Sequence, residues 1–397
     1  MKKMMMVAAL LALAGMGCTK KKKEEGTGGP TGSNMAGSGS SMAGSGSAMT
    51  GSGSAAMAKP MSGEDLAKRY DECWGYFNDA KWDDFKGCYT ADAVFEEPGS
   101  GMPNAQGQDG ILTYVKTWKD AFPDMKGEAV LELVNGHDLA GVVYISGTNN
   151  GPMKTPMGEM PATKNKVGLM MSQYIELDDA GHVKHEWDYL DLPTLMGQLK
   201  PDAKHPVRPV MDKAPMAKEV VVAKDDDKEK ANAEVAKKFV EAFNKHDAKA
   251  LGDVIADDIT WSEQAMPKDD KGKKEFLAMA QAFWKGFSDA KLSPEKMLTA
   301  GDYFAGTGVM DATNDGDMPA MHMKKTGKKM SSPHMVVMKI DNGKVKDGWL
   351  FEDTLSMAQQ LGMMPAAGAG RGAPAGEKKD EKKPADKKAD KKPEKKG

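Results

Sequence analysis

The sequence predicts an α+β fold that occurs twice along the chain. Residues 61–201 and 228–364 each begin with an amphipathic helical pattern and continue with several alternating strands. Helices followed by an antiparallel meander are typical of α+β domains. The two blocks also repeat each other, because the dipeptide at Phe77 recurs at Phe243, 166 residues later, and other motifs keep nearly this spacing. Such constant spacing indicates a tandem duplication of one domain.

The first block predicts its elements in a definite order. Residues 62–78 form an amphipathic helix with Ser62 as its N-cap, and a short second helix follows. The strand AVFEE precedes a third helix, and a closing helix begins near Asp191. Between these two helices lie four segments with the polarity pattern of strands: EAVLELV, GVVYISGT, VGLMMSQYIEL and HVKHEWDYL. The second block repeats this order up to a closing helix near Asp353.

Three polar segments surround the blocks. Residues 19–60 consist mainly of Gly, Ser, Ala and Met without aromatic residues, which is typical of a flexible, disordered linker. Residues 202–227 are expected to link the two domains. Residues 365–397 carry lysine pairs between acids and prolines. This composition predicts either a solvated disordered tail or an electrostatic contact with an anionic envelope polymer.

Residues 1–18 have the pattern of an export signal. Two lysines precede an apolar run over residues 4–14 that is too short to span a bilayer. The ending LALAGMGC resembles the bacterial lipoprotein signal, although Gly15 replaces the usual aliphatic residue. The resemblance implies lipidation of Cys18 and a membrane anchor, and the alternative is an ordinary cleaved secretory signal. Thr19, in place of Asp, favours the outer membrane, facing the periplasm or the cell surface.

The charge balance argues against nucleic-acid binding. The chain has 55 basic and 58 acidic residues and a formal net charge of −3. No basic patch occurs within the two blocks, so neither DNA nor RNA is an expected partner. The expected partners are the membrane, through the lipid on Cys18, and a small-molecule ligand.

The blocks resemble the SnoaL-like polyketide cyclase (ester cyclase) family of the nuclear transport factor 2-like superfamily. The resemblance rests on the early FN and a terminal W-x-x-x-D motif in each block, and on the FPD triplet at Phe122 and a GTxxG strand in the first block. It implies two cone-shaped domains, each with helices packed on a curved antiparallel sheet around one pocket. The family's enzymes need no cofactor and use an Asp at the end of the last strand as general acid/base. Asp191 and Asp353 occupy that position.

Strand alternation predicts which residues face each pocket. The last strand of each block places on one face the residues Trp187, Tyr189 and Asp191, or Trp349, Phe351 and Asp353. A carboxylate beside two large aromatic side chains loses water, which raises its pKa toward a value useful for acid–base chemistry. Both Asp residues also precede a helix, so the alternative interpretation is that they act only as N-caps.

Two glutamates are the other candidate pocket acids. Glu97 shares a strand face with Phe95, and Glu263 shares one with Trp261, so each pocket is expected to hold a pair of acids. The alternative is a solvent-facing carboxylate at the end of a strand.

One departure from the family pattern argues against catalysis. Cyclases usually carry a histidine after the GT of the GTxxG strand, but this chain has Asn149 and Asn314 there. An asparagine can form a hydrogen bond with a ligand carbonyl, but it cannot shuttle protons.

Methionines near residue 320 raise the alternative of a copper-binding protein. Thioethers together with imidazole suit Cu(I). The candidate ligands are Met318, Met321, His322, Met323, Met330, His334 and Met335. Because methionine is also frequent in the signal and the linker, it more simply replaces Leu or Ile in the cores. No metal site and no cofactor are therefore predicted.

Cys73 and Cys88 are the thiols that remain once Cys18 is lipidated. In the fold implied by the resemblance, the segments that carry them pack side by side. A disulfide between them is expected in an oxidising periplasm.

These observations predict an envelope lipoprotein with two pockets that bind small apolar ligands without catalysis. The alternatives are a cofactor-free cyclase or isomerase that uses Asp191 or Asp353, and a periplasmic copper-binding protein. The duplication also suggests that the two domains pair within one chain, because residues 202–227 are long enough to permit it.

Overall fold

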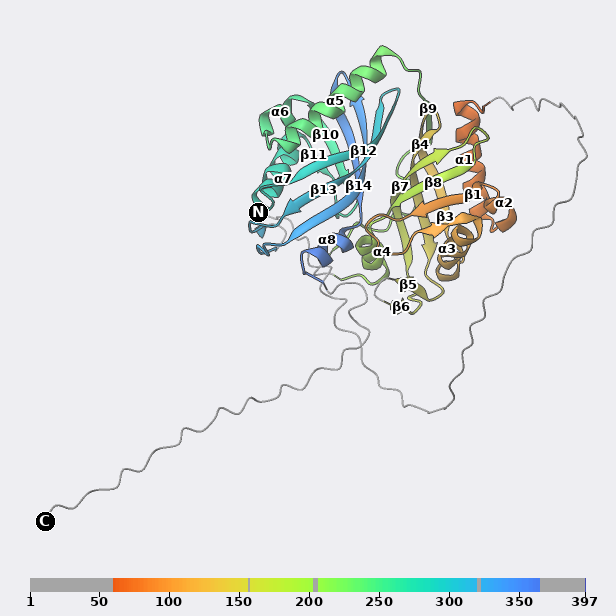
Figure 1. Ribbon diagram of the computed structural model, residues 1–397, viewed down its shortest axis with the longest axis horizontal. Helices are drawn as coiled ribbons and strands as arrows, with labels where there is room; N and C mark the ends of the chain where they lie inside the picture. Colours follow the sequence, from red (N-terminus) through yellow and green to blue (C-terminus); the bar gives the residue numbers. More distant parts are fainter. Residues whose placement is uncertain (1–59, 156–157, 203–205, 320–322, 365–396) are drawn as a thin grey trace, which may run out of the picture.

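The computed structural model describes residues 60–155, 158–202, 206–319, 323–364 and 397. Cys18, the linker up to residue 59 and the tail up to residue 396 lie outside these ranges, as do Met321 and His322 of the candidate copper ligands. Within the described ranges, no helix is both long enough and apolar enough to cross a membrane. The described residues form two domains with the same order of elements (Figure 1), so the predicted α+β fold class is confirmed.

Three helices pack on one face of the first sheet: α1 (Gly63–Asn78), α2 (Trp82–Lys86) and α3 (Gly107–Ala121). The Ser62 side chain caps α1 by accepting a hydrogen bond from the Asp65 amide at 3.1 Å. Leu66, Tyr70 and Phe77 recur at helical spacing and are buried, so α1 presents one apolar stripe to the sheet.

The first sheet has seven strands. In spatial order they are β2 (Ala105–Gln106), β1 (Tyr89–Glu96), β8 (Val183–Tyr189), β7 (Lys166–Leu177), β4 (Asp138–Thr148), β3 (Lys126–Asn135) and β9 (Glu219–Val222). A separate pair consists of β5 (Met153–Thr155) and β6 (Gly158–Met160), and α4 (Leu192–Leu199) follows β8. β9 lies in the segment expected only to link the domains, and it pairs in parallel with β3, with Val221 opposite Leu133.

The second domain repeats this architecture with six strands. In spatial order they are β11 (Asp270–Lys271), β10 (Ile255–Glu263), β15 (Lys344–Glu352), β14 (Lys329–Asp341), β13 (Tyr303–Thr313) and β12 (Lys291–Ala300). Its helices are α5 (Asp227–Asn244), α6 (Ala248–Asp253), α7 (Lys273–Gly286) and α8 (Thr354–Gln360). In both domains the first long strand pairs in parallel with the last one, so the sheet curves around the helices.

The two sheets pack against each other through the faces turned away from α1–α3 and α5–α7 (Figure 1). The buried residues of this interface are Val130, Leu131, Leu133, Ala140, Val142, Tyr144, Met170, Tyr174 and Tyr189 of the first domain and Leu298, Ala300, Tyr303, Ala305, Met335, Val337 and Phe351 of the second. At its edge Lys296 forms an ion pair with Glu176 at 2.5 Å, and the Asn135 amide donates to the carbonyl oxygen of Thr299 at 3.0 Å. Each sheet therefore has one face toward its own helices and one toward the other sheet.

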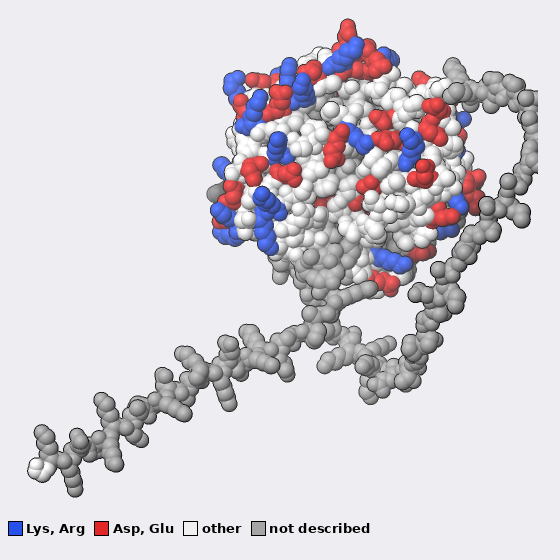
Figure 2. Space-filling model, in the orientation of Figure 1, with Lys and Arg blue, Asp and Glu red and all other residues white. Residues whose placement is uncertain are grey.

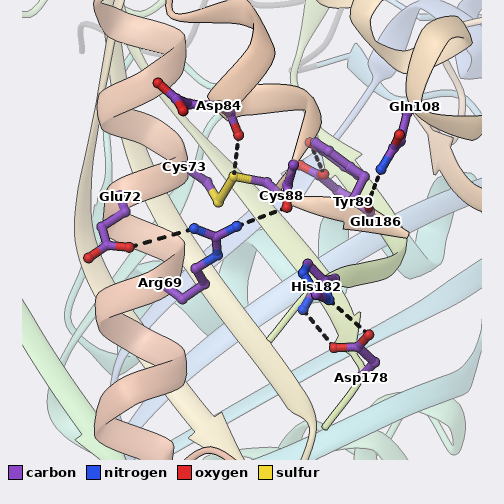
Figure 3. Close-up of a disulfide and its surroundings, with 11 residues drawn as sticks. Arg69, Glu72, Cys73, Asp84, Cys88, Tyr89, Gln108, Asp178, His182 and Glu186 are labelled. Carbon is purple, nitrogen blue, oxygen red and sulfur yellow. Dashed lines mark hydrogen bonds and ion pairs between the residues drawn. A yellow bond between two sulfur atoms is a disulfide. The ribbon is translucent and has the colours of Figure 1, made fainter. Parts of the chain in front are cut away.

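A disulfide joins α1 to the start of the first sheet. Cys73 and Cys88 are bonded across a Cα–Cα distance of 6.0 Å (Figure 3). Arg69, also on α1, donates to the carbonyl oxygen of Gly87 at 2.8 Å and so ties the same two segments together. In the chain-entropy model a loop of this length stabilises the fold by about 3 kcal/mol. Val254 occupies the position of Cys88 in the second domain, so the bridge belongs to the first domain alone.

Acidic and basic side chains are interspersed on the face of the molecule seen in Figure 2, and neither sign dominates a broad area of it. Some charged side chains of the molecule are paired, as where Lys218 reaches both Asp71 and the buried Glu132. This face therefore offers no extended field of one sign that would steer a charged partner.

Candidate functional site

Each domain encloses a cavity between its helices and its sheet, and the two cavities differ greatly in size. The cavity of the first domain has a volume of about 90 Å³, and that of the second has a volume of about 1100 Å³. A duplicated fold has therefore produced two different sites.

The first cavity is filled by aromatic side chains around a buried polar network. Gln173 stands at its centre and accepts hydrogen bonds from the Tyr70 hydroxyl and from the Trp74 indole, the latter at 3.1 Å. The Gln173 amide nitrogen donates to Glu186 and, at 2.8 Å, to Asp188. Every hydrogen-bonding atom of the Gln173 side chain is thus engaged, which holds the two acids in place.

The acids of the first cavity are held in a largely apolar environment. Burial raises the pKa of Glu97 to about 7, although a hydrogen bond from the Tyr114 hydroxyl opposes this shift. Burial and the neighbouring Glu186 charge raise the pKa of Asp188 well above its usual value. Glu186 accepts a hydrogen bond from Tyr89 at 2.7 Å (Figure 3), and burial raises its pKa as well. Glu97 can therefore hold or transfer a proton near neutral pH, and burial favours the protonated form of Glu186 and Asp188 as well.

The second cavity is larger because small side chains replace the aromatic ones on its helices. Ala236 and Val240 on α5 occupy the positions of Tyr70 and Trp74 on α1, both 166 residues earlier. Met279 on α7 takes the place of Tyr114. The walls are mainly aromatic and thioether side chains, among them Phe239, Phe243, Phe276, Phe283, Phe304, Met310 and Met338.

The sheet side of the second cavity has lost the buried network of the first. The strand register aligns Gln173, Glu186 and Asp188 with three residues that cannot form such a network, Val336, Gly348 and Leu350. Trp261 fills part of this space, because a Cβ atom on Gly348 would lie only 2.3 Å from its ring. The inner end of the cavity is therefore apolar.

Three of the polar side chains that line the second cavity lie near the ends of neighbouring strands. His334 and Glu352 are directly opposite each other in the β14–β15 pair, and Glu263 ends the adjacent β10. Burial raises the pKa of Glu352 to about 7 and lowers the pKa of His334 to about 4. Burial together with the Glu352 charge raises the pKa of Glu263 well above its usual value.

Asp191 and Asp353, the predicted catalytic residues, are helix caps. Asp191 accepts hydrogen bonds from the Thr194 amide at 2.8 Å and from the Thr354 amide and hydroxyl at 3.1 and 2.6 Å. It therefore caps both α4 and α8, which come from different domains. Asp353 caps α8 through the Leu355 amide at 2.9 Å. Asp191 also contributes to the wall of the second cavity, but its carboxylate is already fully engaged.

The four aromatic residues predicted to line the pockets do not do so, and this prediction is wrong. Trp187, Tyr189, Trp349 and Phe351 share strand faces as alternation requires, but those faces are turned toward the other domain's sheet. The pocket side of β8 carries instead Glu186 and Asp188. Strand alternation shows which residues share a face but not which face lines the cavity. Because one face of an antiparallel sheet is commonly exposed to solvent, the charged pair Glu186 and Asp188 is easily taken for the solvent-exposed face.

Asn149 and Asn314 are also wrongly predicted as ligand-binding residues. The Asn149 amide nitrogen donates to the carbonyl oxygens of Ala121 and Gly151, and its oxygen accepts from the Thr163 amide at 2.7 Å. Asn314 makes the equivalent bonds in the second domain. Both side chains are fully buried and hold loops together, so no group is left for a ligand.

The two strand-end glutamates lie where the sequence places them, with Glu97 in the first cavity and Glu263 in the second. The candidate copper ligands are divided: Met318 and Met323 line the second cavity, whereas Met335 faces the sheet interface. Among the described residues, no group of three His, Cys, Asp or Glu side chains is arranged to hold a metal ion.

Comparisons with known proteins agree with this fold. The family model of SnoaL-like polyketide cyclases matches residues 64–199 and 233–361. A search of curated proteins found no match. Among solved structures, a protein from Jannaschia sp. CCS1 described as a SnoaL-like polyketide cyclase is 14% identical, with a TM-score of 0.33, over 36% of this chain and 99% of that chain. IdmH from Streptomyces antibioticus, described as a polyketide cyclase, is 20% identical, with a TM-score of 0.29, over 33% of this chain and 98% of that chain.

Each of these two structures aligns with about one third of the chain. The family model accounts for both domains, and its two matched segments make up more than half of the 397 residues. The chain therefore belongs to the SnoaL-like polyketide cyclase family and carries two copies of the family's domain.

Proposed function

We propose that this chain is a lipid-anchored envelope protein that binds a small, largely apolar ligand in the cavity of its second domain. The observation that carries the proposal is the cavity of about 1100 Å³ with its aromatic and thioether walls. Sites for small ligands typically measure about 300–1,000 Å³ and combine apolar walls with a few polar groups. The second cavity has this size and this composition.

The first domain supports the second in this proposal. Its cavity of about 90 Å³ is too small for such a ligand. Its sheet covers the outer face of the second sheet and so stabilises the strands that form the ligand cavity. After the duplication, the first domain would thus have kept a packed interior and a supporting role, and the second domain would have gained an open cavity that binds the ligand.

Binding is tested with the uncharged fluorophore N-phenyl-1-naphthylamine and with variants that carry the first domain's side chains. Ala236→Tyr combined with Val240→Trp and Met279→Tyr should narrow the second cavity and weaken the fluorescence increase. Lys238→Trp, on the exposed side of α5, is the matched control and should bind as the unmodified chain does. Unchanged binding by the narrowed variant, with the fold intact by thermal unfolding, would place the ligand elsewhere.

The anchor is the second part of the proposal. Lipidation of Cys18 would hold the chain, and with it the two domains, at the membrane. Labelled palmitate should be incorporated into the unmodified chain and not into Cys18→Ala, which should leave the membrane fraction. A Cys18→Ala chain that stays with the membrane would contradict the anchor.

A second candidate function is proton transfer next to a carbonyl group in the first cavity, as in a cofactor-free cyclase or isomerase. It is favoured by Glu97, Glu186 and Asp188, which converge there with raised pKa values. The test is deuterium exchange into acetone, a ketone small enough for this cavity. Exchange that is faster with the unmodified chain than with Asp188→Asn would support catalysis, and equal rates would exclude it for this substrate.

A further inference from the structure

Three polar side chains of the second cavity can accept more hydrogen bonds than the described residues donate to them. His334, Glu263 and Glu352 all contribute to its wall. The nearby hydroxyl groups are already engaged, because Thr354 donates to Asp191 at 2.6 Å and Thr194 donates to the carbonyl oxygen of Gln264 at 3.4 Å. A ligand head group that meets this region must therefore supply the hydrogens itself.

His334 offers a lone pair to the cavity. Its side chain is 8% exposed, and Nδ1 lies 3.4 Å from the carbonyl oxygen of Ser332. A carbonyl oxygen can only accept, so Nδ1 carries the hydrogen and Nε2 carries the lone pair in the neutral ring. None of the described residues forms a hydrogen bond with Nε2, which leaves this buried acceptor for a ligand.

The carboxyl groups of Glu263 and Glu352 also accept few hydrogen bonds from the described residues. Glu352 accepts a single long hydrogen bond from the Ser332 hydroxyl at 3.3 Å, and no described residue donates to the carboxylate of Glu263. The charges that act on Glu263 from neighbouring elements are those of Glu352, Asp270, Asp191 and Arg208. Three of these four groups are acidic.

Arg208 does not neutralise the glutamates. One of its guanidinium nitrogens donates to Asp269 at 3.0 Å and the other to the backbone carbonyl oxygen of Glu263 at 2.8 Å. The lysines of the cavity wall, Lys237 and Lys285, are exposed at the mouth. The acidic end of the cavity therefore lacks a cation among the described residues that bonds directly to its carboxylates.

Aromatic rings line the inner part of the cavity, which adjoins its acidic end. Trp261 stands two residues before Glu263 on β10 and packs against Phe276 and Phe239, with centroid distances of 5.1 and 5.6 Å. The faces of aromatic rings attract cations, particularly where water is excluded. Carboxylates and aromatic rings together form the kind of surroundings that stabilises an ammonium group.

We propose that the second cavity recognises amphiphiles with a protonated amino group, whose N–H bonds donate to Glu263, Glu352 and His334. The apolar part of such a ligand lies along the phenylalanine and methionine walls. The ligand's positive charge compensates the clustered acids, and its hydrogens satisfy the acceptors. This inference rests on the proposed binding function of the same cavity and names the chemical class of its ligand.

The test is displacement of N-phenyl-1-naphthylamine from the full chain with Cys18 replaced by Ala. The competitors share one alkyl chain and differ in the head group: dodecylamine, dodecyltrimethylammonium, dodecanol and dodecanoate. Dodecylamine should bind about tenfold or more tightly than dodecanol, because hydrogen bonds to charged groups contribute that much. It should also bind more tightly than the trimethylammonium compound, which has the charge but no N–H bond.

Variants assign the preference to the glutamates. Glu263→Gln combined with Glu352→Gln should reduce the preference for dodecylamine to about twofold or less, whereas the fluorophore should still bind. Glu295→Gln, an exposed acid on β12 that does not line the cavity, is the matched control and should keep the preference. Should the double variant not fold, release of protons from the unmodified chain on dodecylamine binding, measured by calorimetry in two buffers, tests the same carboxyl groups.

The outcomes separate the two proposals. If the fluorophore does not bind the unmodified chain, the proposed function fails. If the fluorophore binds but dodecylamine and dodecanol compete equally, or dodecanoate competes best, the ammonium inference is overturned and the binding function stands.

Discussion

Single residues explain why two copies of one domain have different interiors. In the first domain Glu186 and Asp188 lie deep on β8, where Gln173 satisfies them. In the second domain the corresponding depth is apolar, and the acid of the same strand is Glu352 at its end. A buried carboxyl group is tolerated only where it has hydrogen-bond partners or binds a proton. The acids of each cavity therefore lie where one of these two conditions is met.

Glu97 should make the stability of the first domain depend on pH. Burial raises its pKa from 4.5 to about 7, so the folded state holds the proton more tightly than the unfolded chain does. The stabilisation is complete below about pH 4.5 and is lost as the pH rises through about 7. Glu97→Gln should therefore flatten the fall in the free energy of unfolding over this range, by on the order of 1–3 kcal/mol.

Urea unfolding at several pH values measures this effect. Glu128→Gln, an exposed glutamate on β3, is the control and should leave the pH profile unchanged. A profile for Glu97→Gln that parallels the unmodified chain would show that Glu97 is not buried as described.

Glu352 should give ligand binding a pH dependence of defined sign. Its pKa is raised to about 7 by burial and by the charge of Asp191, so the carboxyl group is protonated below this pH. An ammonium ligand favours the ionised form, and dodecylamine affinity should therefore rise between about pH 6 and about pH 8. Dodecanol affinity, measured by the same displacement, should change much less, and an amine affinity that falls with pH would contradict the assignment.

At the scale of elements, the order of helices and strands was predictable because periodicity reports it directly. The helix over 62–78 corresponds to α1, and Ser62 caps it as expected. Strand β9 was not predictable, because four residues of a polar segment carry too little pattern and their pairing with β3 depends on tertiary contact. The face of β8 that lines the cavity was predicted wrongly, and the physical reason is different. Both faces of this strand are buried, so hydrophobicity does not show which of them faces the cavity.

The capping roles of Asp191 and Asp353 lead to an element-scale prediction. Asp191 accepts hydrogen bonds from backbone amides in the first turns of α4 and α8. Asp353 caps only α8, and its other carboxylate oxygen is buried without a hydrogen-bond donor among the described residues. Loss of one cap typically costs about 1 kcal/mol. Asp191→Ala should therefore lower the free energy of unfolding by about 2 kcal/mol or more, and Asp353→Ala by about 1 kcal/mol or less.

Chemical denaturation of the two variants side by side measures the difference. The fluorophore affinity of the second cavity serves as a control for local structure. A larger loss for Asp353→Ala than for Asp191→Ala would contradict the shared cap between the domains.

At the scale of the whole molecule, the sheet interface makes the two domains one structural unit. Each domain contributes large buried side chains to it, such as Tyr174 from the first and Phe351 from the second. From the sequence, Phe351 and Tyr189 of this interface were predicted to be pocket walls, because a single domain of this fold has one obvious interior. The duplication creates a second interior between the sheets, and no local pattern within one block reports it.

This interface should couple the unfolding of the domains. Leu133 on β3 is fully buried between the sheets, and Leu133→Ala should destabilise the molecule by about 2–4 kcal/mol through lost contacts and a cavity. Because the first domain then supports the second less well, calorimetry should show both domains still melting in one transition at a lower temperature. Leu66→Ala, on the helix side of the first domain, should lower the same single transition. Two separate transitions, of which Leu133→Ala moves only the first-domain one, would mean that the sheets pack without energetic coupling.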